Sequence, residues 1–290
     1  MIAVMGAAGN VGSKVADLLL GQGEPVRALE HRRGLEGLGR RGAEVTTGGD
    51  LTDPASLDLL LKDADAALVA LPDVVTDPEF TATRSRMSRN LADALAGSGV
   101  RHVVVLSTVA AGQADATGPA AGLRELEQRL FALDGPSVLV LRSPFYMENL
   151  LAGVPLLQAQ GINASAIDGD LELPMIATRD VAAETAERLA RRDFGGHGVR
   201  LLVGPEDVSL RAATRALGER LGRPDARYIQ LPAADMRGAL LGAGMSESGA
   251  AAMVELQTGL NQHGSFAAVR RAADLTATTR LGQFLDGALR

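Results

Sequence analysis

The sequence predicts an α/β protein with a doubly wound, mostly parallel sheet and a smaller, mainly helical C-terminal lobe. Two observations predict this class. Six short apolar runs within the first 144 residues alternate with segments of helical spacing across short turns, which is typical of parallel strands with helices on both faces. After residue 145 this alternation breaks down and helical spacing dominates. We therefore expect the sheet to come first and the helical lobe to follow.

The composition indicates a globular chain that forms one large domain or two closely packed ones. The 290 residues are 46% hydrophobic, carry a net charge of −6 and include no cysteine, which excludes disulfides and thiolate metal sites. With four scattered histidines, we expect no metal site. Aromatic residues make up only 3%, and the acidic balance disfavours nucleic-acid binding. The first apolar run, residues 1–5, is too short for a signal peptide or membrane span, which predicts a cytoplasmic protein.

The first strand leads into a glycine-rich turn and then a helix. The apolar run stops at Gly6, two further glycines follow at positions 9 and 12, and helical apolar spacing begins at Val11. Such glycines let a backbone approach a ligand closely, and the helix N-terminus points its free N–H groups at a pyrophosphate. This context favours a Rossmann-type nucleotide site over a purely structural turn. The expected contacts are Gly6, Ala8, Gly9, Asn10, Val11 and Gly12.

The second strand, residues 25–30, ends at the position that meets the adenine ribose in such folds. Glu30 lies about eighteen residues past the last glycine, where an acidic side chain binds a 2′-hydroxyl and favours NAD. Arg32 and Arg33 follow at once, and guanidinium groups suit the 2′-phosphate of NADP. A solvent-exposed loop is the alternative interpretation of the two arginines. The choice between NADPH and NADH therefore stays open.

Four more strands are predicted at residues 43–47, 64–71, 103–106 and 138–141, with helices at 54–61, 79–96 and 121–133. Asp53 before Pro54 is a good helix start, with an N-cap followed by proline in the first turn. The strands end near Asp50, Leu71, Ser107 and Pro144. Because ligands bind at the carboxyl ends of parallel strands, these positions should converge with Gly6 and Glu30 on one edge of the sheet.

The remaining chain is predicted to form the lobe and to return once to the sheet. We expect helices at 145–157, 180–191, 209–221, 233–242 and 250–260, and a strand at 199–203. Residues 1–144 would form the dinucleotide-binding domain, with 165–204 rejoining it. Residues 145–164 and 205–290 would form a substrate-binding lobe that packs directly on this domain and creates a cleft.

Several stretches together resemble the NmrA-like group of atypical short-chain dehydrogenase/reductase proteins. They are residues 6–12 (GAAGNVG), 26–29 (VRAL), 49–53 (GDLTD), 106–108 (LST), 141–149 (LRSPFYMEN) and 204–209 (GPEDVS). The resemblance implies a nicotinamide dinucleotide, usually NADP, on the glycine loop, and adenine contacts near Asp50 and Leu51. It also implies a nicotinamide near Ser107, Pro144 and the strand end Ala70, Leu71 and Pro72. Members include quinone reductases and other small-molecule reductases, and also proteins that bind the dinucleotide as redox sensors.

The chain departs from standard short-chain dehydrogenases because it lacks the Tyr-x-x-x-Lys pair. Its two lysines are Lys14 and Lys62, and its two tyrosines are Tyr146 and Tyr228. Without a cationic neighbour, a tyrosine with a pKa near 10 is a poor proton relay at neutral pH. A quinone accepts hydride to give a stabilised phenolate that water can protonate. The missing pair thus favours quinone or enone reduction, or no catalysis.

Tyr146 and Thr108 are the candidate catalytic residues, because both follow strands at the expected cleft. Phe145, Asn149 and His263 are candidate substrate contacts. The alternatives are core packing at the lobe junction for Phe145 and Tyr146, a hydroxyl that satisfies a strand end for Thr108, capping of the following helix for Asn149 and a solvated loop for His263. We predict an NAD(P)H-dependent oxidoreductase for a small apolar acceptor such as a quinone or conjugated carbonyl, which also suits a tailoring step in secondary metabolism. The alternatives are a non-catalytic dinucleotide sensor and a non-redox isomerase or cyclase. The expected partner is a small molecule, with a homodimer as one option.

Overall fold

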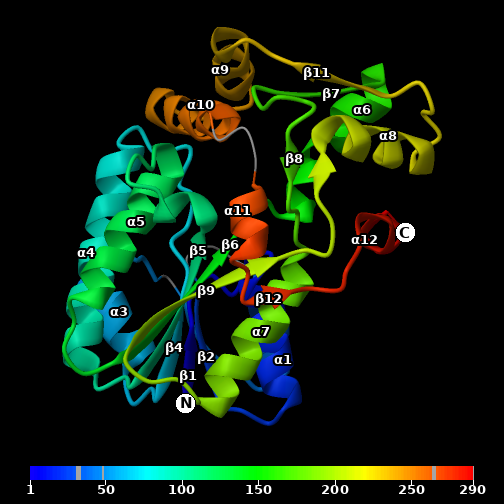
Figure 1. The fold of residues 1–290 in the computed structure, drawn as a ribbon. Helices are drawn as coiled ribbons and strands as arrows, with labels where there is room; N and C mark the ends of the chain where they lie inside the picture. The colour runs from blue at the N-terminus through cyan, green and yellow to red at the C-terminus, as the bar shows by residue number, and fades with distance from the viewer. Residues whose placement is uncertain (31–33, 48, 263–265, 290) are drawn as a thin grey trace.

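Parallel strands form the centre of the protein. The computed structural model describes residues 1–30, 34–47, 49–262 and 266–289, without the side chains of Glu30 and Thr47. The strands of the central sheet are β1 (Ile2–Val4), β2 (Val26–Glu30), β3 (Glu44–Thr47), β4 (Ala66–Val69), β5 (His102–Thr108), β6 (Ser137–Ser143), β9 (His197–Val203) and β12 (Leu275–Thr276). Within the described residues they pair in the order β12-β9-β6-β5-β4-β1-β2-β3, and every pairing is parallel (Figure 1). The predicted doubly wound, parallel sheet is confirmed.

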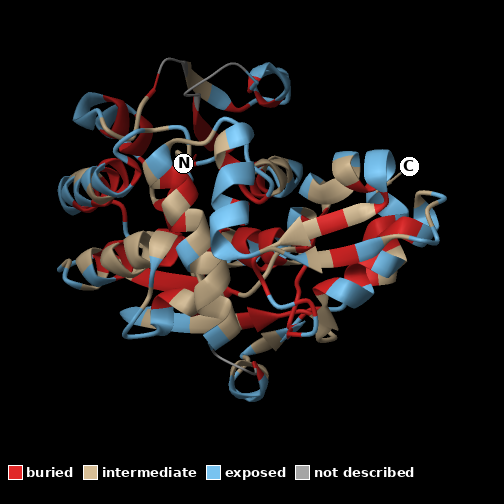
Figure 2. Ribbon diagram, turned by 90° about the horizontal axis from the view of Figure 1, so that it is seen from above, coloured by how far each residue is buried: buried red, intermediate tan, exposed pale blue. Residues whose placement is uncertain are grey.

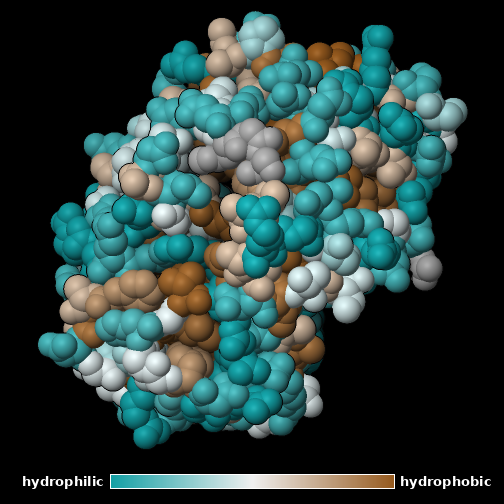
Figure 3. Space-filling model, viewed as in Figure 1, coloured by the Kyte–Doolittle hydropathy of each residue, from teal (hydrophilic) through white to brown (hydrophobic). Residues whose placement is uncertain are grey.

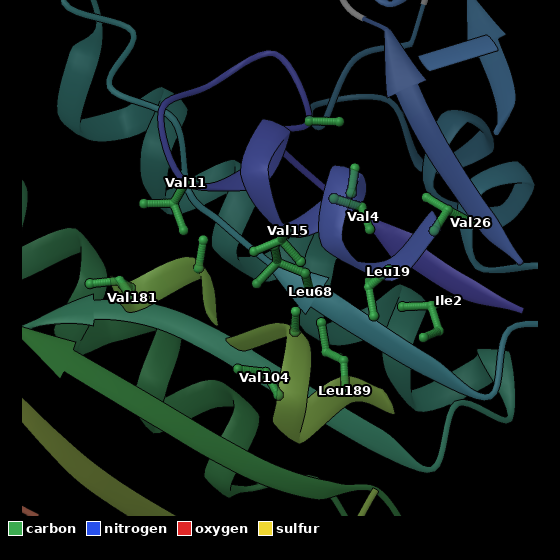
Figure 4. Packing of buried hydrophobic residues seen from close by; sticks show 14 of the residues in the cluster. Ile2, Val4, Val11, Val15, Leu19, Val26, Leu68, Val104, Val181 and Leu189 are labelled. Carbon is green, nitrogen blue, oxygen red and sulfur yellow. The ribbon is translucent and has the colours of Figure 1, made fainter. Parts of the chain in front are cut away.

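Helices cover both faces of this sheet. One face carries α1 (Gly12–Gly21) and α7 (Thr178–Arg191), and the other carries α3 (Pro54–Leu61), α4 (Phe80–Ser98) and α5 (Gly118–Phe131). Figure 4 shows the first interface, where Val15 and Leu19 of α1 and Leu189 of α7 pack on the strands. On the opposite face, Leu57 and Leu91 pack against the sheet residue Val105. Alternate residues of each strand thus enter two separate cores, and Figure 2 shows this burial concentrated along the strands.

Local sequence signals explain where several elements begin. Asp53 caps α3, because its carboxylate accepts hydrogen bonds from the Ser56 N–H at 3.1 Å and the Ser56 hydroxyl at 2.7 Å. Pro54 occupies the first turn, as the pair predicts. A short helix that was not expected, α2 (Glu36–Arg40), follows the β2 strand. Its five residues include two glycines, which weakens any helical pattern in the sequence.

The C-terminal lobe is mainly helical and holds two small two-stranded sheets among the described residues. Its elements are η2 (Met147–Gly153), α6 (Val154–Gln160), β7 (Ile162–Ser165), β8 (Glu172–Leu173), β10 (Val208–Ser209), α8 (Leu210–Arg220), β11 (Arg227–Gln230), α9 (Ala233–Gly242), α10 (Glu247–Gln262), α11 (Ala267–Arg271) and α12 (Leu281–Ala288). The predicted helices at 209–221, 233–242 and 250–260 are confirmed as α8, α9 and α10. Residues 205–290, all expected in the lobe, include β12, which pairs with β9 in the central sheet.

The prediction of a helix over residues 145–157 is wrong for the first residues of that range. Phe145 and Tyr146 are extended, because the Phe145 carbonyl accepts the Ile176 N–H and the Met147 N–H donates to the Ile176 carbonyl, both at 3.0 Å. A 3-10 helix, η2, follows, and the α-helix α6 begins only at Val154, with Pro155 in its first turn. Pairing with a distant residue therefore overrides the helical spacing of the side chains.

The lobe contacts the loop after β4 and the start of α5. The Ser246 hydroxyl donates to the Asp77 carbonyl at 2.6 Å, and the Ser246 N–H donates to the Val75 carbonyl at 2.9 Å. Gly249 lies so close to the Val75 carbonyl that a Cβ there would overlap it. The lobe is thereby joined to the sheet domain through α10, which lies above α4 and α5 in Figure 1.

The surface is largely hydrophilic on the face seen in Figure 3, with a hydrophobic patch below its centre. Only three large hydrophobic side chains among the described residues are classed as exposed, namely Leu18, Leu59 and Val199. No helix in the described part of the chain combines the length and apolar character needed to cross a bilayer.

Candidate functional site

The glycine loop between β1 and α1 is shaped by close backbone approaches. Gly6 has a φ of +68°, a left-handed conformation that favours glycine. A Cβ on Gly12 would overlap the Gly6 carbonyl oxygen, so only glycine lets α1 sit this close to the strand. The Gly9 N–H donates to the same carbonyl at 2.8 Å. Of the predicted contact residues, Ala8, Gly9 and Asn10 are exposed, while Val11 and Gly12 are buried beneath them.

The N-terminus of α1 suits a phosphate. No side chain caps this terminus, and its first turn contains no acidic residue. The Ser13 N–H donates to the Gly9 carbonyl at 3.1 Å. The positive end of the helix dipole meets no acidic side chain in the first turn, so it can attract an external anion. Together with the exposed loop, this arrangement fits a dinucleotide pyrophosphate at the carboxyl edge of β1.

A cavity of about 400 Å³ lies beside the glycine loop, on the side of β2. Its lining includes Ala8 and Ser13 from the first βα unit and Leu38 and Arg41 from the α2 region. Arg41 forms an ion pair with Asp17 of α1, and its second guanidinium nitrogen lies 3.4 Å from the Asp17 carbonyl. Sequence reasoning missed Arg41, because its place in the cavity depends on how the unpredicted α2 folds back toward α1.

Two of the residues predicted around the ribose lie wholly or partly outside the described part of the chain. Arg32 lies outside the described residues, as does the side chain of Glu30, although its main chain ends β2. Asp50 and Leu51 lie after β3, as predicted. Asp50 accepts the Thr52 N–H at 2.7 Å, and Asn90 of α4 donates to the Thr52 carbonyl at 2.9 Å. These bonds fix the loop at the sheet edge for which the family resemblance implies adenine contacts.

The end of β4 lies directly against the glycine loop. A Cβ built on Gly6 would come within 3.3 Å of the Ala70 Cβ. Leu71 is buried, and the Pro72 carbonyl accepts a 2.6 Å hydrogen bond from Arg84. Arg84 is itself buried on α4 and also binds Asp73. Burial lowers the pKa of Arg84, while Asp73 opposes that shift. The arginine thus holds the strand end that was predicted near the nicotinamide.

Ser107 at the end of β5 belongs to a buried polar network. Its hydroxyl donates to Glu127 of α5 at 2.5 Å. The same carboxylate binds Arg142 of β6 through two nitrogens, at 3.1 and 2.5 Å. A bidentate pair of this kind is geometrically specific. The Ser107 proton is therefore committed to Glu127, and any contact of this hydroxyl with a ligand would be as an acceptor. Sequence reasoning did not foresee this network, because its three residues come from three separate elements.

Thr108, Ser143 and Tyr146 lie at the ends of neighbouring strands. Thr108 is paired with Ser143 in the β5–β6 register, and its hydroxyl accepts the Ala110 N–H at 3.4 Å at the start of η1 (Val109–Gly112). Burial raises the pKa of Tyr146 to about 12; Ser143 lowers it and Glu148 raises it further. The buried Ser143 hydroxyl makes no hydrogen bond of good geometry with the described residues, yet it is close enough to affect Tyr146.

The other candidates around Tyr146 differ in their surroundings. Phe145 packs at the edge of the lobe core. Asn149 is exposed within η2. Glu148, which lies thirty residues before α7 in the sequence, caps that helix, because its carboxylate accepts the Thr178 N–H at 3.0 Å. His263 lies outside the described residues.

A second cavity, of about 200 Å³, lies between the two lobes. One wall follows β5 and runs from Ala110 through Gln113 to Thr117, and the other is formed by α10. Leu260 of α10 lines the cavity and packs in the same cluster as Phe145. The structure therefore brings Thr108 and Tyr146 to the same edge of the sheet, while Phe145 packs in the cluster that contains Leu260 of the cavity lining. None of the three is among the described residues that line the cavity. The contribution of α10 to the cavity was not predicted, because no sequence pattern shows which face of that helix meets the sheet domain.

Comparison with known proteins identifies the family. The profile of the NmrA-like family matches residues 1–281. The chain belongs to the NmrA-like family. This confirms the resemblance stated from the sequence, and the parallel sheet with its flanking helices is the Rossmann-type arrangement.

Other NmrA-like and related proteins show what this chain is similar to. It is 32% identical to a (4-alkanoyl-5-oxo-2,5-dihydrofuran-3-yl)methyl phosphate reductase of Streptomyces griseus, over 83% of this chain and 80% of that protein. It is 29% identical to an NAD(P)H azoreductase of Xenophilus azovorans, over 88% and 86% of the two chains. The crystal structure of an NADPH-dependent quinone oxidoreductase of Escherichia coli with NADPH superposes with a TM-score of 0.80 at 24% identity, covering 100% of both chains. At that identity the superposition supports the fold alone.

Proposed function

We propose that this NmrA-like protein is an NAD(P)H-dependent reductase that transfers hydride to a small conjugated acceptor such as a quinone or conjugated carbonyl. The observation that carries the proposal is the uncapped α1 N-terminus behind an exposed glycine loop, at the same sheet edge as an interlobe cavity. The names of the relatives, which are NAD(P)H-dependent or phosphate-ester reductases, support this reaction class. A tailoring reduction in a biosynthetic pathway is one setting for it.

In this mechanism the protein mainly binds and positions. The glycine loop and α1 would hold the pyrophosphate, and the strand ends at Ala70 and Ser107 would flank the nicotinamide, which would supply the hydride when the dinucleotide is bound. Thr108 and Tyr146 orient the acceptor oxygen. Because the pKa of Tyr146 is about 12, this hydroxyl stays protonated and donates a hydrogen bond without relaying a proton. A quinone or enone suits this arrangement, since its reduced anion is stabilised and water can protonate it.

The position of Arg41 suggests which dinucleotide, NADPH or NADH, the protein prefers. Arg41 lines the cavity beside Ala8 and is paired with Asp17, and we propose that its guanidinium group binds the 2′-phosphate of the adenine ribose. We expect NADPH to bind more tightly than NADH. Replacing Arg41 with Ala should weaken NADPH binding about tenfold or more and leave NADH binding nearly unchanged, because a charge-assisted hydrogen bond contributes about 1.5–3 kcal/mol. Arg40→Ala, at an exposed neighbour that does not line the cavity, is the matched control.

The test combines binding and turnover. All four dinucleotide forms are titrated by fluorescence or calorimetry, and the best reduced form is then offered to a panel of quinones and conjugated carbonyls. We expect NADPH binding and acceptor-dependent NADPH oxidation. If none of the four dinucleotide forms binds, the proposed reductase function is contradicted.

A dinucleotide sensor is the second candidate, and the environment of Tyr146 favours it. The charged group that acts on this tyrosine is Glu148, which raises the pKa of Tyr146, whereas a lysine would lower it. Tight dinucleotide binding with no oxidation above background, across the full acceptor panel, would support the sensor and contradict the reductase.

A further inference from the structure

The interlobe cavity has an unusual set of polar groups. Asp115 contributes a carboxylate from the wall that follows β5, and Glu255 contributes another from α10. The Thr258 hydroxyl also lines the cavity, but it donates to the Val254 carbonyl at 2.9 Å. The Thr117 hydroxyl likewise donates to the Glu255 carbonyl at 3.4 Å. With their protons engaged by the main chain, both hydroxyls present lone pairs, so they add acceptors to the two carboxylates.

The described residues of the lining carry no positive charge. None of the described residues that line the cavity is Lys, Arg or His. The nearby Arg124 of α5 is directed to the main chain of the same wall, where it donates to the Ala111 carbonyl at 3.3 Å and the Gln113 carbonyl at 3.0 Å. It therefore supports the wall and does not line the cavity. Gln113 and Gln262 supply the amide donors of the lining.

We infer that this cavity selects acceptors by charge. It accepts uncharged or cationic ring compounds that carry hydroxyl or amino donors, and it excludes phosphate, sulfonate and carboxylate groups. The inference rests on the proposed function in taking this cavity as the acceptor site. Its volume of about 200 Å³ suits one or two rings, since a cavity of about 150 Å³ holds benzene.

The exclusion follows from like-charge repulsion. An anion that enters the cavity meets the carboxylates of Asp115 and Glu255, both exposed, and two hydroxyl lone pairs, and the described lining offers only amide groups to bind it. A cation is attracted by the same two carboxylates and lone pairs. On this basis the chain differs in substrate class from its Streptomyces relative, whose name specifies a phosphate ester.

The binding test uses two ring compounds that cannot be reduced, benzyltrimethylammonium and benzenesulfonate. Each is titrated by calorimetry or NMR into the wild-type protein in the presence of saturating dinucleotide. We expect the ammonium compound to bind at least about tenfold more tightly than the sulfonate, as like-charge exclusion predicts. Equal binding of the two, or tighter binding of the sulfonate, would overturn the inference.

Variants locate the effect in the cavity. The double variant Asp115→Asn, Glu255→Gln removes both charges with little change in shape, and it should bring the ratio of the two affinities close to one. Asp93→Asn is the matched control, because Asp93 is exposed on α4 and does not line the cavity. An unchanged ratio in the double variant, with unchanged thermal stability, would contradict the inference.

A turnover test separates the two proposals. The kcat/KM values of 1,4-naphthoquinone and its 2-sulfonate are compared in the wild type and the double variant. The comparison between proteins cancels the difference in reduction potential between the two quinones. We expect the double variant to gain about tenfold in relative activity on the sulfonate. If neither quinone is reduced by any protein, the reductase proposal fails for quinones, while the ammonium and sulfonate titrations still decide the charge selection.

Discussion

Tyr146 illustrates how its neighbours define what a residue can do. Burial is the main cause of its raised pKa, and Glu148, which is held in place as the cap of α7, raises it further. The folded pKa of about 12 exceeds the ordinary value of 10. The protonated form is therefore favoured by folding, and its contribution to stability is complete below pH 10 and is lost as the pH rises from 10 to 12. Across the physiological range this tyrosine is a fixed hydrogen-bond donor.

This state of Tyr146 predicts a flat alkaline profile. Between pH 7 and 9.5, ionisation of Tyr146 should cause no change in kcat/KM. The pH profiles of the wild type and Tyr146→Phe should therefore have the same shape. The variant should lower kcat/KM by about three- to tenfold at every pH in that range, since a single hydrogen bond contributes about 0.5–1.5 kcal/mol. Steady-state kinetics with a quinone measure this.

Tyr228→Phe serves as the control for Tyr146→Phe. The Tyr228 hydroxyl donates to the Ile167 carbonyl at 2.7 Å inside the lobe, so its loss should lower thermal stability and leave the pH profile intact. A change in kcat/KM near pH 8 that is present in the wild type and in Tyr228→Phe but absent in Tyr146→Phe would show that Tyr146 ionises during turnover.

At the scale of elements, the β1–α1 unit depends on how closely a helix can approach a strand. Gly12 touches the Gly6 carbonyl, Gly6 turns back with a positive φ, and the end of β4 closes the other side at Ala70. The three contacts place the helix N-terminus over the edge of the sheet. The anion binding that we propose at this point would depend on backbone geometry more than on any side chain.

Gly12→Ala tests that dependence. The added Cβ overlaps the Gly6 carbonyl, so α1 must move, at a cost of about 1–3 kcal/mol in unfolding free energy. We expect dinucleotide affinity to fall at least about a hundredfold, because the N–H groups lose their alignment. Gly21→Ala, at the other end of α1 with nothing within 4 Å of an added Cβ, should bind normally. Unchanged affinity in Gly12→Ala would show that the pyrophosphate lies elsewhere.

For the whole molecule, the contact between α5 and α10 decides whether the interlobe cavity exists. Gly118 begins α5 with a φ of +53°, and a Cβ there would overlap the Ala252 carbonyl of α10. The Thr117 hydroxyl donates to the Glu255 carbonyl in the same contact. The wall from α10 is thus held against the sheet domain, while the glycine loop lies in a separate contact region.

Gly118→Ala should therefore separate acceptor binding from dinucleotide binding. We expect the acceptor KM to rise about tenfold, as a displaced wall loses about 1.4 kcal/mol of binding, while the dinucleotide Kd stays within about twofold. Hydrogen exchange in α10 should increase. Gly238→Ala, on α9 with open space around it, should show neither effect. A matched loss of dinucleotide affinity would indicate a single cooperative site.

Local patterns in the sequence were sufficient for the framework of the sheet domain. The alternating apolar runs predict the parallel strands, Asp53 and Pro54 predict the start of α3, and the spacing of the glycines at 6, 9 and 12 predicts the turn into α1. Each of these signals acts between residues that are close in sequence, through periodicity, capping or backbone freedom. The family resemblance extends over the same stretches.

Only the tertiary structure decided the features that join distant residues. The extended backbone at Tyr146 results from pairing with Ile176, and Arg41 reaches the cavity beside the glycine loop through the short α2. The proton of Ser107 is held by a carboxylate twenty residues away in sequence, and the cavity acquires its charge where the wall after β5 meets α10. These contacts depend on how elements pack, and no local pattern encodes packing across so many residues. The sequence by itself therefore determined the glycine turn at which we propose that a dinucleotide binds, whereas the packing of the two lobes decided what lines the interlobe cavity.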